Sequence, residues 1–116
     1  MNKIAFGLFI RKLRKEKGMS LRDIAKSVDV SFVNIAHIEN GRVVTSKKII
    51  KQLAKAFDYD VDKLLAAANE IGEDVEKIIR KIPTAVPDFL RTAKNLTKED
   101  WINLTEQVKE MNKKKK

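Results

Sequence analysis

The stretch that decides the fold runs from Leu21 to Ile38 and reads LRDIAKSVDVSFVNIAHI. Apolar residues recur in it three and four positions apart, which predicts two short helices and not strands. Ser20 and Ser31 stand just before the two apolar runs, where a hydroxyl side chain caps a helix N-terminus. Only three or four residues separate the two helices, so the sequence predicts a tight turn between helices that cross closely.

The same stretch meets each requirement of a helix-turn-helix motif. Helices that cross closely need a small side chain at their contact, and Ala25 supplies it. Val30 is an apolar plug for the turn, and Ile35 and Ile38 face inward from the second helix. Residues at i, i+4 and i+7 share the outward stripe of that helix: Val33, His37 and Asn40. A recognition helix presents such a stripe to the major groove of DNA.

Helical spacing continues on both sides of the motif. A helix with one apolar face precedes it and stops at Gly18, and Gly41 ends the second helix of the motif. A fourth helix opens at Thr45 or Ser46, and Asp60 caps a short fifth helix. The sequence has no convincing strand pattern. These signals predict an all-α fold that begins with a domain of five helices.

Three more apolar faces follow with helical spacing. They are Val75/Ile78/Ile79/Ile82, Phe89/Leu90/Ala93 and Trp101/Leu104/Val108/Met111. Pro83 ends the first of these helices, and Pro87 can start the second. Thr97, with Asp100 three residues later, forms a variant of the capping box before the third. Isolated helices this short are marginal in water, so we expect residues 73–111 to bury these faces against each other, the first domain or a second subunit.

The positive charge of the chain is unevenly placed. The net charge is +9, and residues 1–68 carry 14 basic and 7 acidic side chains, whereas residues 69–116 carry 11 and 9. Four of the last 11 form the lysine run 113–116, and we expect residues 112–116 to be a disordered tail. A positive surplus favours polyanionic partners. The surface that faces such a partner therefore belongs to the first half of the chain.

Residue usage argues against several other classes of protein. The chain has no cysteine and one histidine, so disulfide scaffolds, thiolate metal sites and multi-histidine metal sites are excluded. The sequence offers no nucleophile–histidine–acid set and no glycine-rich phosphate loop, so we expect no catalytic residue, no metal and no cofactor. No apolar run approaches ~18 residues, and no signal peptide is recognisable. We therefore expect a cytoplasmic protein without a membrane partner.

Residues 4–68 resemble the Xre/Cro family of phage-repressor-type regulators. The resemblance rests on Phe6-Gly7, Ile10, Leu13–Gly18, Ile24-Ala25, Val30-Ser31, Ile38–Arg42 and Leu53–Phe57. It implies a five-helix repressor-like DNA-binding domain at residues 1–68, with the remaining helices as a C-terminal extension.

The resemblance also implies which residues contact DNA. By the family pattern, the recognition helix spans residues 32–39, and its base-reading residues are Phe32, Val33 and His37. Phe32 and Val33 have no hydrogen-bonding side chain, so they would sense thymine methyl groups; the alternative is local packing around the helix cap. His37 would donate to a guanine or a phosphate, or else it is a solvated surface histidine. The positions that match the family's DNA-backbone contacts are Ser20, Asn34, Asn40, Arg42 and Lys47.

Two further positions carry structural expectations from the same resemblance. Arg14 and Glu39 match a pair that family members join in a salt bridge between the first and third helices. Asp29 stands where the family usually has glycine, so we expect a left-handed, somewhat strained residue in the turn. Leu8 and Phe9 replace commonly charged residues, and Leu8 should be exposed unless something covers it.

The sequence and the resemblance together predict a sequence-specific DNA-binding transcriptional regulator. Its partner is double-stranded DNA, and the habit of binding two-fold operators implies a homodimer. The expected role is repression of a mobile element, a prophage or the protein's own operon. The alternative is an antitoxin-like protein that represses its operon and holds a partner protein through residues 73–111.

Overall fold

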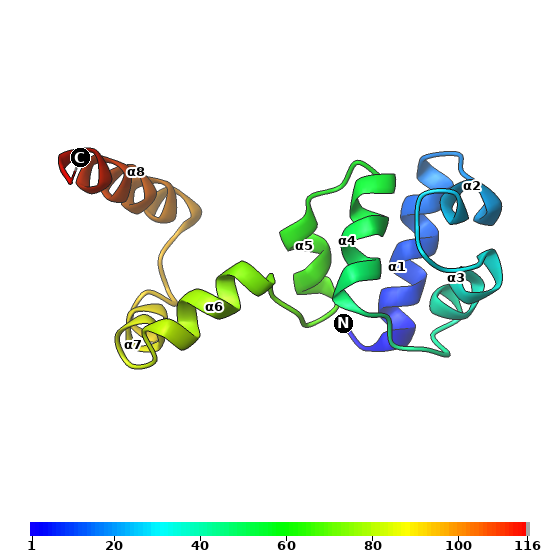
Figure 1. Cartoon of the computed structure of the whole chain (residues 1–116), viewed down its shortest axis with the longest axis horizontal. Coiled ribbons are helices and arrows are strands. Elements are labelled where there is room, and N and C mark those ends of the chain that lie inside the picture. The colour runs from blue at the N-terminus through cyan, green and yellow to red at the C-terminus, as the bar shows by residue number, and fades with distance from the viewer. Residues whose placement is uncertain (116) are drawn as a thin grey trace. The chain divides into compact units, whose positions relative to one another are not determined.

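The computed structural model describes residues 1–115, and this part of the chain is entirely helical (Figure 1). The helices are α1 (Lys3–Glu16), α2 (Leu21–Ala25), α3 (Phe32–Glu39), α4 (Lys47–Ala56), α5 (Val61–Ala67), α6 (Glu73–Lys81), α7 (Ala85–Thr92) and α8 (Lys98–Lys114). The predicted fold, five helices followed by a helical extension, is therefore confirmed. The turn between α2 and α3 is longer than the three or four residues expected, because α2 ends at Ala25 and α3 begins only at Phe32. Among these helices, none has the length and apolar character that crossing a membrane requires.

Short polar side chains begin most of the helices in the first half of the chain. The N-cap side chains in this half that accept the backbone N–H three residues later are Asn2, Ser20, Ser31, Ser46 and Asp60. Ser46, and not Thr45, therefore opens α4. At the opposite ends, Gly18 and Gly41 have φ values of +64° and +69°, which glycine adopts without the steric cost that a Cβ brings.

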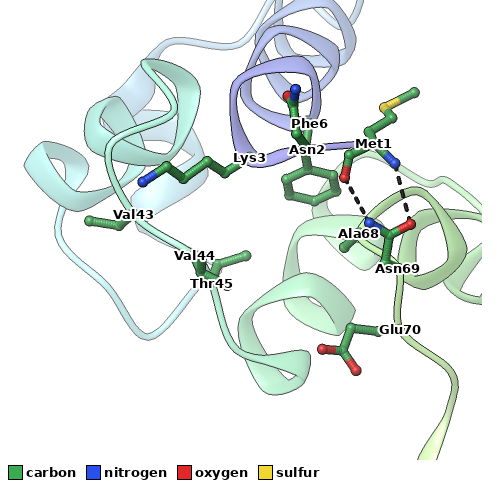
Figure 2. Close-up of a pocket in the computed structure, with 10 residues that line it drawn as sticks. All are labelled: Met1, Asn2, Lys3, Phe6, Val43, Val44, Thr45, Ala68, Asn69 and Glu70. Carbon is green, nitrogen blue, oxygen red and sulfur yellow. Dashed lines mark hydrogen bonds between the residues drawn. The ribbon is translucent and has the colours of Figure 1, made fainter.

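The N-terminus of the chain is fastened to the end of α5 (Figure 2). The Met1 amine donates to Oδ1 of Asn69 at 3.4 Å, and the Asn69 side-chain amide donates to the Met1 carbonyl at 3.0 Å. Asn69 has a φ of +60°, a conformation that asparagine tolerates better than most residues. A pocket that includes Phe6 and Val44 lies beside this contact. The two hydrogen bonds hold the start of α1 against the end of α5.

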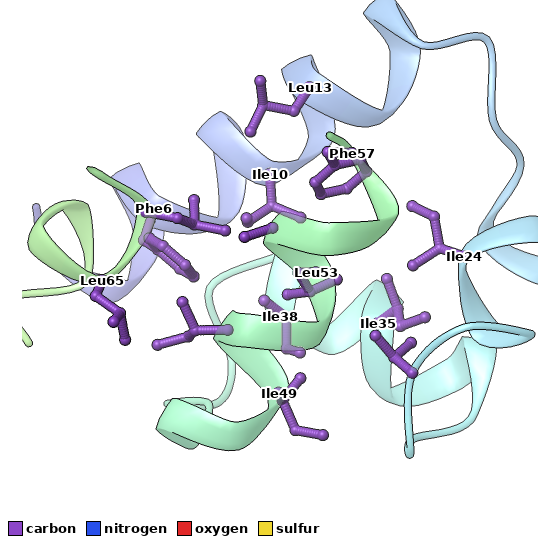
Figure 3. Packing of buried hydrophobic residues seen from close by; sticks show 14 residues of the cluster. Phe6, Ile10, Leu13, Ile24, Ile35, Ile38, Ile49, Leu53, Phe57 and Leu65 are labelled. Atoms are coloured by element: carbon purple, nitrogen blue, oxygen red, sulfur yellow. The ribbon is translucent and has the colours of Figure 1, made fainter. Parts of the chain in front are cut away.

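The hydrophobic core of the first compact unit, residues 1–76, is built from α1 to α5 (Figure 3). Its largest fully buried side chains are Ile10, Ile24, Ile35, Ile50, Leu53, Phe57, Leu64 and Leu65. Leu8 lies outside this core and is exposed, as expected. Phe9 is different, because it packs edge-on against Tyr59 with ring centroids 5.8 Å apart. Of the two α1 residues that are apolar where the family commonly has a charge, only Leu8 therefore leaves its apolar surface exposed.

Gly7 marks the closest approach between α1 and α3. A Cβ at this position would lie 2.3 Å from the carbonyl oxygen of Ile38 and 2.6 Å from that of Glu39. Both atoms belong to the backbone, so neither can swing aside as a side chain would. The backbone of α3 therefore rests directly on α1 at a point where only glycine fits.

The second compact unit begins at Lys77, within α6, and has almost no core. Ala93 is its only buried hydrophobic residue among residues 77–115. Phe89 of α7 contacts Trp101 of α8 edge-on, with ring centroids 6.1 Å apart. α7 begins at Ala85, two residues before the proline expected to start it; Pro87 fits there because the first N–H groups of a helix have no partner to lose.

The lysine tail differs from expectation. Residues 112–114, expected to be disordered, continue α8 as far as Lys114. Positively charged lysines at a helix C-terminus interact favourably with the negative end of the helix dipole. In addition, Nζ of Lys113 lies 3.2 Å from Oε1 of Glu110. Lys115 caps the helix, and residue 116 lies outside the described residues. Favourable charge placement is therefore sufficient to extend α8 through most of the tail.

We predict that Gly7→Ala destabilises the protein, although alanine favours a helix over glycine by about 1 kcal/mol. The added methyl group meets two fixed backbone carbonyls, and overpacking of this kind costs about 1–3 kcal/mol. Chemical denaturation followed by circular dichroism measures the change. The control is Leu8→Ala at the neighbouring exposed position, which should stay within about 0.5 kcal/mol. A more stable Gly7→Ala protein would contradict the close approach.

Candidate nucleic-acid interface

The helix α3 has one buried side and one open side. Ile35, Ile38 and Glu39 are buried, whereas Phe32 is 37% exposed and Val33 is 48% exposed. The first turn is fixed because the Ser31 hydroxyl accepts the backbone N–H of Asn34 at 3.2 Å. The helix therefore has the bounds predicted for the recognition helix and presents its N-terminal side chains outward.

Arg22 of α2 holds the ring of Phe32. The guanidinium carbon of Arg22 lies 4.5 Å from the centre of the Phe32 ring, a distance at which a cation and an aromatic face attract each other. Arg22 is not among the residues predicted from the sequence. Its position in the second helix carries no signal by itself, because the contact exists only once α2 and α3 cross. The Phe32 ring is thus packed against Arg22, while part of the side chain remains exposed to solvent.

The other base-reading and backbone-contacting candidates lie around the same helix. His37 is half-buried, whereas Asn34 and Asn40 are exposed. Arg42 follows the helix, is exposed, and donates its backbone N–H to the carbonyl of His37 at 2.9 Å. Arg42 therefore extends the open side of α3 with a positive charge.

Ser20 is engaged at the start of α2. Its hydroxyl accepts the backbone N–H of Asp23 at 3.0 Å, and its own N–H donates to the Asp23 carboxylate at 2.8 Å. These hydrogen bonds to Ser20 lower the pKa of Asp23. The N-terminus of α2 thus already carries a carboxylate.

Lys47 does not extend freely toward a partner. Its ammonium group donates to Glu76 and lies 3.6 Å from a carboxylate oxygen of Glu70. The hydrogen bond to Glu76 and the negative charges of Glu76 and Glu70 raise the pKa of Lys47. Of the five predicted backbone contacts, Lys47 is the one whose charge two carboxylates already balance.

Asp29 does not adopt the expected left-handed conformation. Among the described non-glycine residues, positive φ values occur at Asp58 and Asn69. Asp29 is instead fixed to α4: its N–H donates to Oε1 of Gln52 at 2.8 Å, and Nε2 of Gln52 donates to its carboxylate at 3.0 Å. Lys48 lies 3.0 Å from the same carboxylate. The expectation of strain was wrong because hydrogen bonds to α4 define the turn without it.

Arg14 and Glu39 join the first and third helices. Nε and Nη2 of Arg14 donate to the two carboxylate oxygens of Glu39 at 2.6 and 3.0 Å, and Nη1 donates to the carbonyl of Met19 at 3.0 Å. Glu39 is 6% exposed and Arg14 is 14% exposed. The hydrogen bonds to Glu39 raise the pKa of Arg14, so the guanidinium group stays charged at neutral pH.

Comparisons with known proteins agree with this geometry. A family model described as helix-turn-helix matches residues 10–64. This match supports the expected resemblance of the N-terminal domain to the Xre/Cro-type helix-turn-helix family. The domain is 31% identical over 64 residues to the HTH-type transcriptional regulator DdrOP3 of Deinococcus deserti, covering 55% of this chain and 50% of that protein.

Two further similarities support the family. The competence pilus inhibition repressor of Acinetobacter baylyi is 32% identical over 68 residues, which cover 59% of this chain and 62% of that protein. The crystal structure of the clp gene regulator ClgR from C. glutamicum matches with a TM-score of 0.51 and 28% identity, over 58% of this chain and 87% of that one. The chain thus spans about half to two thirds of the length of the first two relatives.

We predict that Arg14→Ala destabilises the protein by about 3 kcal/mol, because it leaves the Glu39 carboxylate buried and unpaired. The matched control is the double change Arg14→Met and Glu39→Leu, which removes both charges and keeps apolar volume. This variant should recover part of the loss in chemical denaturation. Two small and additive single effects would reject the coupling.

We predict a titration midpoint for Asp29 below its ordinary value of 3.8, because Gln52 first and Lys48 second lower its pKa. A lowered folded-state pKa means that the carboxylate stabilises the fold above its unfolded pKa, and that this contribution is lost as the pH falls through the folded pKa. The stability difference between the protein and Asp29→Asn should therefore shrink at acidic pH.

The measurement is a carboxyl titration by NMR, with thermal unfolding of both proteins across the same pH range. Gln52→Leu and Lys48→Met should each raise the Asp29 midpoint, because the hydrogen bond from Gln52 and the hydrogen bond and charge of Lys48 all lower the pKa of Asp29. A midpoint that neither variant moves would contradict the contact.

Proposed function

We propose that this protein is a transcriptional regulator that binds specific double-stranded DNA with α3 in the major groove, acts as a homodimer, and represses its target. The observation that carries the proposal is α3 itself, which is buried on one side by the core and open on the other at its N-terminal residues. A helix of this kind, crossing a second helix across a short turn, is the element that enters the major groove in helix-turn-helix proteins. The Acinetobacter relative is named a repressor, which favours repression.

The proposed base contacts are Phe32, Val33 and His37. The first two offer carbon atoms only, so they would read thymine methyl groups by contact. Arg22 supports this role for Phe32, because it packs on one face of the ring and leaves the side chain 37% exposed. His37 is half-buried and would donate a single hydrogen bond to a base or a phosphate.

The proposed backbone contacts are Ser20, Asn34, Asn40, Arg42 and Lys47. Arg42 is the strongest of these candidates because its charge is exposed beside the end of α3. Lys47 would have to exchange the carboxylates of Glu70 and Glu76 for a phosphate. Phosphate contacts of this kind position a protein on DNA and do not discriminate between sequences.

A second candidate function has a specific observation in its favour. The apolar faces of α6, α7 and α8 remain partly open, with Ile78 55% exposed and Met111 56% exposed. Open faces of this kind suit protein association. An antitoxin-like role, in which these helices hold a partner protein while α3 represses the operon, uses the same faces.

We predict that Val33→Ala and His37→Ala change the preferred sequence, whereas Arg42→Ala weakens binding to all sequences about equally. Selection of bound duplexes from random DNA gives the preference, and titration of the selected duplex gives the affinity. The matched control is Val44→Ala, which removes the same atoms from a valine that is 83% exposed and lies outside α3. It should leave the preference unchanged.

The same titrations, repeated at several salt concentrations, test the electrostatic contribution to DNA binding. The logarithm of the binding constant should fall by about 0.9 per phosphate contact for each tenfold rise in salt. Arg42→Ala should make that slope about one unit shallower. A preference that depends on Arg42 and not on Val33 or His37 would overturn the proposed orientation of α3.

A further inference from the structure

The helix α8 carries a continuous apolar stripe that its own chain covers only in part. We define the α8 seam as Trp101, Leu104, Val108 and Met111, spaced three, four and three residues apart. This is the spacing of helices that pack along their length in a coiled coil. Trp101 and Leu104 are half-buried, whereas Val108 is 52% exposed and Met111 is 56% exposed. The first half of the seam is therefore partly covered, and the second half is open.

We propose that α8 pairs antiparallel with α8 of a second copy of this chain. The proposal rests on the homodimer of the proposed function and names the surface that forms it. In an antiparallel pair, the N-terminal half of one α8 seam packs against the C-terminal half of the α8 seam in the second copy. Trp101 then faces Met111 of the second copy, and Leu104 faces Val108. The exposed C-terminal half of each seam is thereby covered by the N-terminal half of the other, which carries Trp101. The Met111 thioether then lies beside an aromatic ring, which is a favourable contact.

The charges along α8 favour the antiparallel direction. The first turn holds Glu99 and Asp100, and the last turn holds Lys113 and Lys114. A parallel pair would place acidic ends together and lysine ends together, which is unfavourable. An antiparallel pair places each acidic end beside a basic end. Within the heptad pattern of the seam, Asp100 and Lys114 occupy the same flanking position, so each would face the other across the interface.

The remaining charges of α8 fit the same arrangement. Lys109 pairs with Glu106 and Lys113 pairs with Glu110, each at 3.2 Å. These four residues lie on the side of the helix away from the seam, so their charges are balanced within one copy. One carboxylate oxygen of Asp100 accepts the Thr97 N–H at 3.0 Å, and the carboxylate remains exposed. It can therefore also accept a lysine from a second copy.

The first test compares two residues of equal exposure. Val108 in the seam and Ile102 on the outer side are each 52% exposed, so a lysine at either position leaves the single chain about equally stable. Sedimentation equilibrium of the full chain should show a dimer for the protein and for Ile102→Lys, and a monomer for Val108→Lys. Circular dichroism of each variant reports whether its helices persist. If Val108→Lys and Ile102→Lys changed dimerisation equally, the proposal that the α8 seam forms the dimer interface would be wrong.

The second test reverses one charge at a time. Lys114→Glu places like charges opposite each other at two symmetric sites, and we expect the dimer to weaken about tenfold. Lys113→Glu changes the net charge by the same amount on the outer side, so it is the matched control. Adding Asp100→Lys to Lys114→Glu should restore the dimer, because the two charges are then exchanged. A dimer that responds to both single changes alike would overturn the antiparallel register.

The third test reads the direction directly, since the chain has no cysteine of its own. In the antiparallel register Gln107 meets its own symmetry mate, so Gln107→Cys should form a disulfide-linked dimer on oxidation. In a parallel pair, Val108→Cys would cross-link instead. DNA binding of each variant to a single half-site separates the two proposals. If the unmodified chain stays monomeric and still binds a half-site, the α8 pairing and the homodimer are both wrong, whereas DNA binding through α3 is retained.

Discussion

The placement of α3 depends on the ion pair between Arg14 and Glu39. Arg14 reaches from the last turn of α1 to the last residue of α3, and its third hydrogen bond goes to the carbonyl of Met19, just before α2 begins. One side chain therefore connects the three elements that surround the proposed DNA-facing side of the domain. A buried ion pair adds little net stability compared with apolar residues of the same size. Its contribution here is to fix geometry, because the two-pronged contact holds α3 in one register along α1.

The glycine contact on α1 complements this pair. Gly7 lets the backbone of α3 rest on α1 near Ile38 and Glu39, and Arg14 binds the Glu39 side chain about two turns further along α1. A helix as short as α3 has little stability of its own. Two fixed points, one steric and one electrostatic, therefore hold it while its N-terminal side chains remain open.

The parts of the fold that depend on neighbouring residues follow from the sequence, and those that depend on distant residues do not. The N-termini of three helices are set by local hydrogen bonds, since each cap side chain accepts a backbone N–H only three residues away. These caps are Ser20, Ser31 and Asp60. The bounds of α3 could be predicted for this reason. The contact of Arg22 with Phe32 depends on how two helices cross, and the two bonds between Asp29 and Gln52 join residues 23 positions apart. No periodicity in the sequence reports such pairs.

Under the proposed function, the side chains on the open side of α3 also limit how specifically one copy can bind DNA. Good bidentate hydrogen bonds discriminate between bases by about 1–3 kcal/mol each, and Phe32 and Val33 form none. A single half-site read mainly by apolar contact would therefore be weakly specific. Joining two such domains makes the second binding event intramolecular and raises the overall affinity without any new base contact. The second compact unit leaves its apolar faces partly open, with Ala93 its only buried hydrophobic residue among residues 77–115. Association through those faces would join two domains and supply this gain in affinity.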